Sequence, residues 1–189
     1  MENFETNNEI NKNEKPRWKV ELIEWIKSLA FAVIAALLIV RFIFSFTVVR
    51  GESMMPTLHN GDRLIELKID KLFYTYTRGD IVVIKDKEKT NSDNYVKRII
   101  AVGGDRVQVT GGDVFVNSEK LDEEYIFDNI YTEGEIDIVL NEDEVFVIGD
   151  NRLPGASKDS RYFGPVNRKS LKGRCVLRVF PFNRFGGLN

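Results

Sequence analysis

The sequence predicts a mainly β protein: a main antiparallel β domain with a smaller inserted β subdomain, preceded by one N-terminal transmembrane helix. Three observations lead to this prediction. One long apolar segment lies near the N-terminus, and short β-branched segments bounded by Gly, Asp and Asn follow it. No helical patterns alternate with these segments, so a parallel sheet of βαβ units is not expected.

The composition limits the chemistry that this chain of 189 residues can perform. A net charge of -2 argues against nucleic acid as the main partner. The chain has one cysteine, Cys175, and one histidine, so an intramolecular disulfide is excluded and a zinc site of the usual kind is not expected. We expect no cofactor, and any enzyme chemistry must come from hydroxyls, amines and carboxylates.

The first element is a membrane anchor at residues 25–45, preceded by a polar tail at residues 1–24. The uncharged run at residues 28–40 is short for a spanning helix. Arg41 lies near its far end, however, where a long side chain can reach the interface, and two tryptophans precede the run as interfacial anchors. We place the span roughly at Trp25–Phe44, about 20 residues, the usual length for a hydrocarbon core.

Basic residues predict the orientation of this anchor. They are more numerous before the apolar run than after it, so the tail should be cytoplasmic and the following domain extracytoplasmic. Those before the run are Lys12, Lys15, Arg17, Lys19 and Lys27, and those that follow closely are Arg41 and Arg50.

Two other interpretations of the segment compete with a retained signal anchor. It could be a cleaved signal peptide, because its apolar core is short, but no small-x-small site follows within a few residues. It could be a buried amphipathic helix of a soluble protein, but residues 30–40 are apolar all round, which does not suit a helix with one face at the surface. The retained anchor fits the sequence best.

Beyond residue 46 the sequence predicts short strands joined by glycine-containing turns such as Asn60-Gly61 and Gly103-Gly104-Asp105. We assign 46–105 and 145–189 to the main domain, and 106–144 to the inserted subdomain. The expected strands are residues 62–67, 80–84, 95–102, 106–109, 113–116, 144–148 and 174–180.

The insert is strongly acidic. Residues 110–147 contain twelve acidic residues and one basic residue, Lys120. Such a charge run is usually a solvated face. We therefore expect this subdomain to lie away from the chemistry.

Ser53 is the first candidate for chemistry, in the segment Gly51-Glu52-Ser53-Met54-Met55-Pro56. A serine nucleophile needs a base, because a free hydroxyl is a weak attacker at neutral pH. The base could be His59, the only histidine, or Lys97, which lies in an apolar run where burial can neutralise its amine. We expect His59 to be a solvent-exposed turn residue.

Four segments together resemble the bacterial type I signal peptidases, in their Gram-positive form with a single anchor. Behind the anchor they follow in the family's order, and the resemblance extends to Pro181-Phe182-Asn183-Arg184. The segments are Ser53-Met54-Met55-Pro56-Thr57-Leu58; Arg78-Gly79-Asp80-Ile81-Val82; Tyr95-Val96-Lys97-Arg98-Ile99; and Gly149-Asp150-Asn151-Arg152 with Ser157-Lys158-Asp159-Ser160-Arg161.

The resemblance implies a role for each matching residue. Ser53 would be the acylating nucleophile and Lys97 the general base, with Ser157 orienting the amine. Met54 would lie beside the small side chain of the substrate, and the substrate would add as a strand beside Tyr95-Val96-Lys97. Two structural ion pairs would support the site, Asp159 with Arg161 and Asp150 with Arg98.

Two positions depart from the family pattern. Some members have a serine two residues before the nucleophile that helps to bind the oxyanion, and this chain has Gly51 there, as many Gram-positive-type members do. The family commonly has two residues between the arginine of its Gly-Asp-Asn-Arg motif and the next serine. This chain has Leu153-Pro154-Gly155-Ala156, and the Pro-Gly pair predicts a wider turn.

The sequence thus predicts a single-pass cell-membrane serine endopeptidase that removes signal peptides from exported preproteins after small-x-small sites such as Ala-x-Ala. Its expected partners are signal-peptide-bearing preproteins and the lipid bilayer, on which Phe180, Phe182 and Phe185 could also dock. Two alternatives remain. One is a self-cleaving repressor-type Ser–Lys peptidase, against which the anchor argues, and the other is a non-enzymatic anchored β domain.

Overall fold

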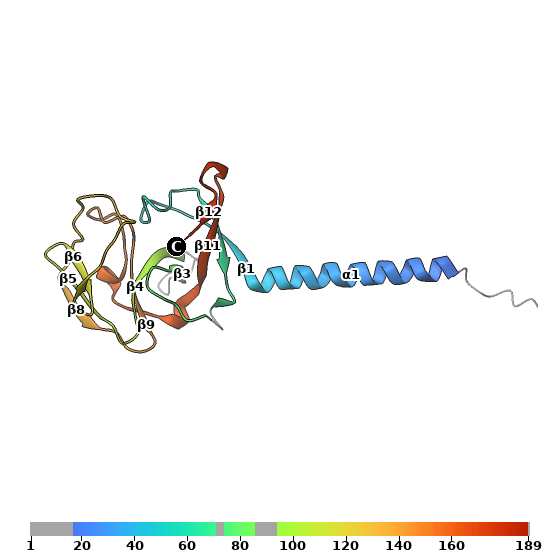
Figure 1. Cartoon of the computed structure of the whole chain (residues 1–189), viewed down its shortest axis with the longest axis horizontal. Coiled ribbons are helices and arrows are strands. Elements are labelled where there is room, and N and C mark those ends of the chain that lie inside the picture. The colour runs from blue at the N-terminus through green and yellow to red at the C-terminus, as the bar shows by residue number, and fades with distance from the viewer. Residues whose placement is uncertain (1–16, 71–73, 86–93, 189) are drawn as a thin grey trace, which may run out of the picture. The chain divides into compact units, whose positions relative to one another are not determined.

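The structure is a computed structural model that describes residues 17–70, 74–85 and 94–188. Helix α1, Arg17–Ile43, is long and apolar enough to cross a membrane, by length and composition (Figure 1). It begins eight residues before the predicted start of the anchor, residue 25. It ends two residues before the predicted end, residue 45, because residues 44 and 45 belong to the first strand. Residues 1–16 of the predicted tail lie outside the described residues.

The rest of the chain, from residue 42, is one compact unit of two antiparallel sheets. Within the described residues the larger sheet has eight strands in the order β1-β2-β11-β3-β4-β9-β10, with β12 paired to β11. These strands are β1 Phe44–Val48, β2 Arg63–Leu67, β3 Ile81–Lys85, β4 Asn94–Val102, β9 Glu144–Ile148, β10 Val166–Asn167, β11 Leu171–Phe180 and β12 Gly186–Gly187.

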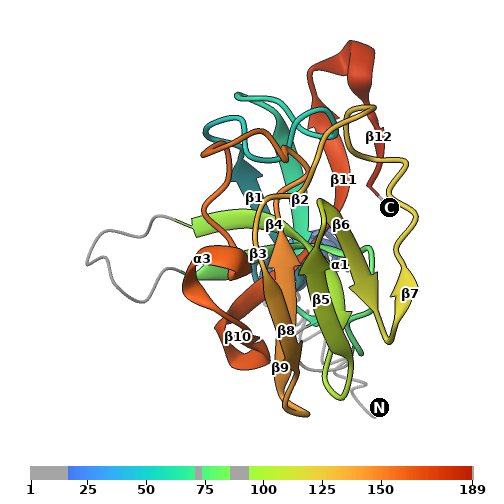
Figure 2. The same cartoon turned by 90° about the vertical axis from the view of Figure 1, so that its left-hand side faces the viewer.

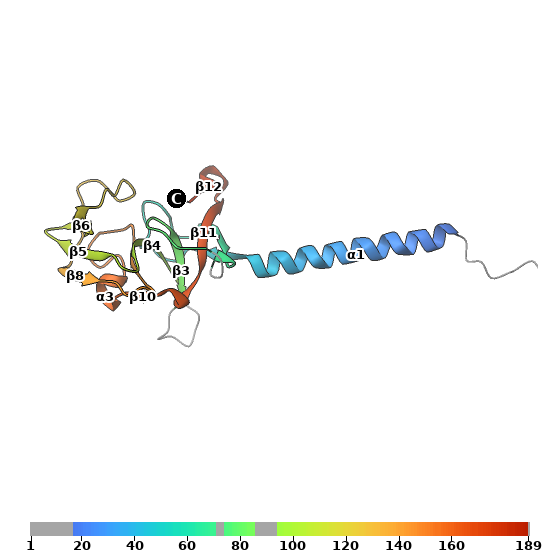
Figure 3. The same ribbon diagram turned by 60° about the horizontal axis from the view of Figure 1, so that its bottom comes forward.

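The smaller sheet has four strands in the order β7-β6-β5-β8, within the described residues. The strands are β5 Arg106–Thr110, β6 Asp113–Val116, β7 Glu119–Lys120 and β8 Ile136–Val139. Figure 2 shows β5, β6 and β8 side by side, and Figures 1 and 3 both place them at the end of this domain opposite β11 and β12. Short helical turns complete the fold: α3 Ser160–Phe163, η1 Arg168–Ser170 and η2 Phe182–Arg184.

Strands β3 and β4 lie in the middle of the larger sheet and are buried on both faces. Ile81 and Val83 of β3 contribute to one apolar cluster, and Val82 and Ile84 contribute to another on the opposite face. A third cluster joins the two sheets by packing Ile100 and Phe146, among others, against valines of β5 and β6. Alternation along a strand puts successive side chains on opposite faces, so a strand buried on both faces reads as a continuous apolar run.

The predicted antiparallel β fold is confirmed, and all seven predicted strands are present within two or three residues of their predicted ends. β1, which overlaps the end of the predicted anchor, and the short strands β7, β8, β10 and β12 are not among the predicted strands. One expectation is wrong. The acidic insert does not lie away from the candidate site, because Glu123 and Tyr125 contact Arg152 and Arg98.

Candidate active site

Ser53 lies in a turn that a neighbouring loop holds in place. The Leu58 N–H donates to the Met54 carbonyl at 2.8 Å, which closes the turn on itself. Asn151 binds it from outside: its backbone N–H donates to the Ser53 carbonyl at 3.1 Å, and its side-chain Nδ2 donates to the Glu52 carbonyl at 3.0 Å. The position of the hydroxyl therefore depends on residues almost a hundred positions away in the chain.

Lys97 lies in the middle of β4, and its Nζ is 2.6 Å from Ser53 Oγ. Its partner in the β3 ladder is Val82, so its stem shares a face with the apolar residues around Val82. Only 2% of Lys97 is exposed. A hydroxyl and an amine at this separation can exchange a proton directly.

Burial lowers the pKa of Lys97 from 10.5 to about 8, because a charged ammonium loses its hydration in this environment. The carboxylates of Asp159 and Asp150 act in the opposite direction, and Arg161 adds to the lowering. A substantial fraction of the amine is therefore neutral in mildly alkaline solution. A neutral amine has the free electron pair that a base requires.

The first predicted ion pair, Asp150 with Arg98, is formed and buried. Arg98 donates from Nε and Nη2 to the two carboxylate oxygens at 2.9 and 2.8 Å. It also donates from Nη1 to the Gly79 carbonyl at 2.8 Å. Arg98 follows Lys97 on β4, so this pair fixes the strand of the amine to the loop that follows β9.

The second predicted pair, Asp159 with Arg161, is also formed. Arg161 donates from Nε and Nη2 to Asp159 at 2.9 and 2.8 Å, and Asp159 also accepts the Gly149 N–H at 3.1 Å. Burial opposes the Asp159 charge, but the hydrogen bonds and charge of Arg161, with smaller contributions from Ser157 and Gly149, hold the pKa of Asp159 below its usual value. Asp159 caps α3 as well, since its side chain accepts the Arg161 N–H.

Ser157 lies at the site, packed against Gly149. A Cβ added to Gly149 would collide with the Ser157 hydroxyl and with the Ser53 carbonyl, so glycine is required for this close approach. The Ser157 oxygen is buried and makes no well-formed hydrogen bond in the described part of the chain. The predicted wider turn before it is closed by the Ala156 N–H, which donates to the Leu153 carbonyl at 3.0 Å.

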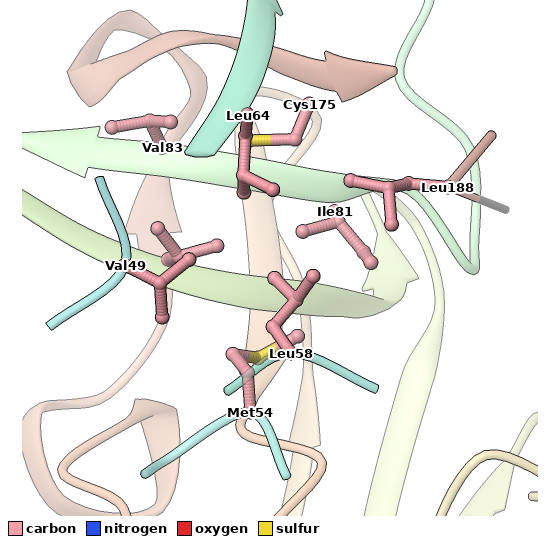
Figure 4. Close-up of a cluster of buried hydrophobic side chains, with 9 residues drawn as sticks. Val49, Met54, Leu58, Leu64, Ile81, Val83, Cys175 and Leu188 are labelled. Atoms are coloured by element: carbon pink, nitrogen blue, oxygen red, sulfur yellow. The ribbon is translucent and has the colours of Figure 1, made fainter. Parts of the chain in front are cut away.

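Met54 follows Ser53 in the chain, and Tyr95 lies near Lys97. Met54 is buried in an apolar cluster with Leu58, Val49 and Ile81 (Figure 4). The Tyr95 ring centroid lies 5.8 Å from Lys97 Nζ, on the same face of β4 as the amine.

His59 is half-buried, whereas the sequence analysis expects an exposed turn residue. Its Nδ1 is in contact with the Arg184 guanidinium, and Arg184 pairs with Asp62 at 2.8 Å. In the described part of the chain the hydrogen-bond partner of Ser53 Oγ is Lys97, not this imidazole.

Several residues that shape the site receive no role from the sequence. Asn151 and Arg152 belong to a motif that the sequence identifies, but their contacts could not be read from it. Glu123, Tyr125 and Thr132 carry no signal at all, because acidic residues in an irregular segment are usually solvated. In the structure all of them are partly or fully buried.

Comparison with known proteins places these residues in a family. The family model of "Signal peptidase, peptidase S26" matches residues 22–180. Signal peptidase I P of Bacillus subtilis subsp. natto is 37% identical over 182 residues, covering 91% of this chain and 96% of that protein. Signal peptidase IB of Staphylococcus aureus (strain Mu50) is 33% identical over 184 residues, covering 88% and 94%.

A crystal structure of a signal peptidase I from Enterococcus faecalis aligns with a TM-score of 0.45 at 27% identity, covering 53% of this chain and 96% of that one. Because the family model covers most of the sequence and the two bacterial relatives align along nearly their whole length, the chain belongs to the signal peptidase family of S26 peptidases, which remove signal peptides.

Proposed function

We propose that this peptidase works by a Ser–Lys dyad, with Ser53 Oγ as the nucleophile and Lys97 as the general base. The observation that carries the proposal is the 2.6 Å contact between Lys97 Nζ and Ser53 Oγ, made by a lysine that is 2% exposed. The lowered pKa of Lys97, about 8, agrees with this role. A lysine that stayed protonated could not accept the serine proton.

The reaction then has two halves. Lys97 takes the proton of Ser53 Oγ as this oxygen attacks the scissile carbonyl carbon, and the resulting ammonium returns the proton to the leaving amine as the peptide bond breaks. Water attacks the acyl-enzyme next, with Lys97 again taking and returning one proton, and Ser53 is released. The Ser53 N–H, which has no acceptor in the described part of the chain, is the donor for the oxyanion.

The supporting residues hold this pair in place. Ser157, whose buried hydroxyl has unused hydrogen-bonding capacity, would orient the Lys97 amine when substrate is bound. The pairs Asp150–Arg98 and Asp159–Arg161 fix the loop after β9 from two sides. Each pair holds the backbone around Gly149: Asp150 is the next residue in the chain, and Asp159 accepts the Gly149 N–H.

The substrate would bind as an added strand on β4. β9 pairs with β4 only from Arg98 onward, so Val96 and Lys97 lie beyond the end of that ladder. An extended peptide there would gain main-chain hydrogen bonds and place alternate side chains against the sheet. Val96 and Met54 belong to one close-packed apolar cluster, which would admit only small side chains and so favour Ala-x-Ala sequences.

The membrane would be the second partner. Helix α1 would be the anchor, with the tail cytoplasmic and the peptidase domain extracytoplasmic. At the β11 end of the domain Phe180, Phe182 and Phe185 are all exposed, as lipid contact would require. An anchored enzyme meets membrane-borne preproteins at a raised local concentration.

The test uses the full chain in detergent with a preprotein that carries one Ala-x-Ala site, followed by N-terminal sequencing of the product. We expect cleavage after the second alanine, and no cleavage by Ser53→Ala, Lys97→Met or Lys97→Arg. Arginine keeps the positive charge but does not deprotonate, so it isolates the base function. Near-normal turnover by Lys97→Arg would overturn the dyad, and a product cut elsewhere would overturn the proposed specificity.

A further inference from the structure

A second group of polar side chains is buried beside the candidate site, centred on Arg152. The Arg152 guanidinium donates from Nη1 to Glu123 at 2.8 Å and to Thr132 Oγ1 at 2.6 Å, and Nη2 forms an ion pair with Glu123. Its Nε donates to the Gly149 carbonyl at 2.9 Å. Side-chain exposure is 0% for Arg152 and 8% for Glu123. This arrangement uses nearly the whole donor set of a guanidinium.

This group touches both elements that carry the dyad. Through Gly149 it reaches the loop whose next residues bind Ser53, since the Asn151 N–H donates to the Ser53 carbonyl. It also reaches β4, because the Tyr125 hydroxyl donates to Glu123 at 2.6 Å and the Tyr125 ring centroid lies 4.0 Å from the Arg98 guanidinium.

The two side-chain acceptors, Glu123 and Thr132, come from residues 121–133, an irregular segment between β7 and β8 that belongs to neither sheet. Buried ion pairs are a weak source of stability, since apolar residues of similar volume often serve as well. They do fix geometry, because each donor must meet its acceptor. Burial next to the Glu123 carboxylate also raises the pKa of Tyr125, which keeps its hydroxyl protonated as a donor.

We propose that Glu123 and Tyr125 are positioning residues for catalysis: acting through Arg152 and Arg98, they hold the Gly149–Arg152 turn, and with it Ser53, in register with Lys97 on β4. This inference rests on the proposed dyad. It assigns the acidic insert a part in the reaction although none of its residues contacts the reacting atoms.

The first experiment compares Glu123→Gln with Glu124→Gln in the full chain, using a peptide substrate. Glu124 lies next to Glu123 but is exposed, so it is a matched control for the same change of charge. We expect Glu123→Gln to lower kcat by about 10–100-fold, since a displacement of the reacting groups by about 1 Å is enough for such a loss. KM should change by less than about threefold, and Glu124→Gln should behave like the wild type.

Loss of stability could also lower activity, so a second variant separates the two effects. In Glu123→Gln with Arg152→Met the unpaired buried charge is removed, and the free energy of unfolding should return toward the wild-type value. Arg152→Met also removes the hydrogen bond to the Gly149 carbonyl, so kcat should stay low. If kcat recovers together with stability, Glu123 has only a structural role and the proposal is overturned.

Two further variants separate the loss of one hydrogen bond from a general loss of stability. Tyr125→Phe keeps the ring under Arg98 and removes only the hydroxyl, and we expect a fall in kcat of a few-fold with the fold intact. Val109→Ala, in the core of the smaller sheet, should lower stability but leave kcat unchanged. A normal kcat for both Glu123→Gln and Tyr125→Phe would overturn the proposal while Lys97→Met stayed inactive, whereas activity in Lys97→Met would overturn the dyad itself.

Discussion

Two arginine–aspartate pairs in this protein have nearly the same geometry and very different surroundings. Arg98 and Asp150 form two hydrogen bonds of 2.9 and 2.8 Å, and Arg106 and Asp137 on the smaller sheet form two of 2.7 and 2.6 Å. Side-chain exposure is 2% and 0% for the first pair but 48% and 49% for the second. We therefore expect burial, not hydrogen-bond length, to decide how much the stability of the protein depends on each pair.

The largest effect is expected from Asp150→Asn. The change leaves the Arg98 charge buried without its partner, which should lower the free energy of unfolding by about 3–5 kcal/mol. Peptidase activity should fall with it, because Arg98 adjoins Lys97. Urea unfolding monitored by circular dichroism, with turnover measured below the transition, checks both. A loss no larger than that of Asp137→Asn would show that burial does not distinguish the pairs.

Lys97 extends the comparison to a buried amine that forms no ion pair with any of the described carboxylates, although the charges of Asp159 and Asp150 act on it. Its folded pKa of about 8 is below the unfolded value of 10.5, so between these pH values the unfolded chain binds more protons and stability rises with pH. Relative to Lys97→Met, the wild type should gain up to roughly 3 kcal/mol across this window. Unfolding of both proteins at several pH values gives the difference, and a constant difference would contradict the lowered pKa.

The pH dependence of peptidase activity should also be set by Lys97, with activity rising as the amine loses its proton. In the proposed dyad the neutral amine is the reactive form, so kcat should rise with pH through about 8 and then level off. A pH–rate profile of the wild type on a peptide substrate measures this limb. A limb that lies near the pKa of free lysine would mean that burial does not tune the amine.

Gly149 is a crowded position and Gly186 is an open one, so the two glycines can be compared by the same substitution. A methyl group there would overlap Ser157 and the Ser53 carbonyl, so Gly149→Ala should destabilise the fold by about 1–3 kcal/mol and lower activity strongly. Gly186 in β12 has nothing within 4 Å of an added Cβ, so Gly186→Ala is the matched control. Equal behaviour of the two variants would argue against close packing at the site.

The smallest effect is expected from Asp137→Asn. Both members of this pair are in contact with water, where ion pairs are weak and screened by salt. The midpoint of thermal unfolding should stay within experimental error of the wild-type value at moderate ionic strength. A clear loss at high salt would show that this pair is more than a surface contact.

The sequence was a good guide to the strands and to the motifs, for a physical reason. Strands such as β3 and β9 are continuous apolar runs bounded by glycine and aspartate, so their type and length follow from composition. The ion pairs Asp150–Arg98 and Asp159–Arg161 could be expected from the resemblance to a family.

The contacts of the acidic insert with Arg152 and Arg98 could not be expected from either source. Glu123 looks like its exposed neighbour Glu124 in sequence, and only the fold brings it to Arg152, 29 positions away. Gly149 belongs to a motif that the sequence identifies, but the close approach of Ser157 and Ser53 that requires a glycine there has no local signature. Contacts between irregular segments depend on tertiary packing, which short-range patterns do not encode.

The distance in sequence between Ser53 and Lys97, 44 positions, has a consequence for the newly made chain. In an unfolded chain the two residues are apart and the amine keeps its proton, so the proposed dyad would have neither an aligned nucleophile nor a base. Hydrolytic capacity would then arise only when β4 is packed between β3 and β9 and the loop after β9 holds the Ser53 turn. An incompletely folded chain would be harmless to its neighbours, and the onset of turnover would itself be a readout of completed folding.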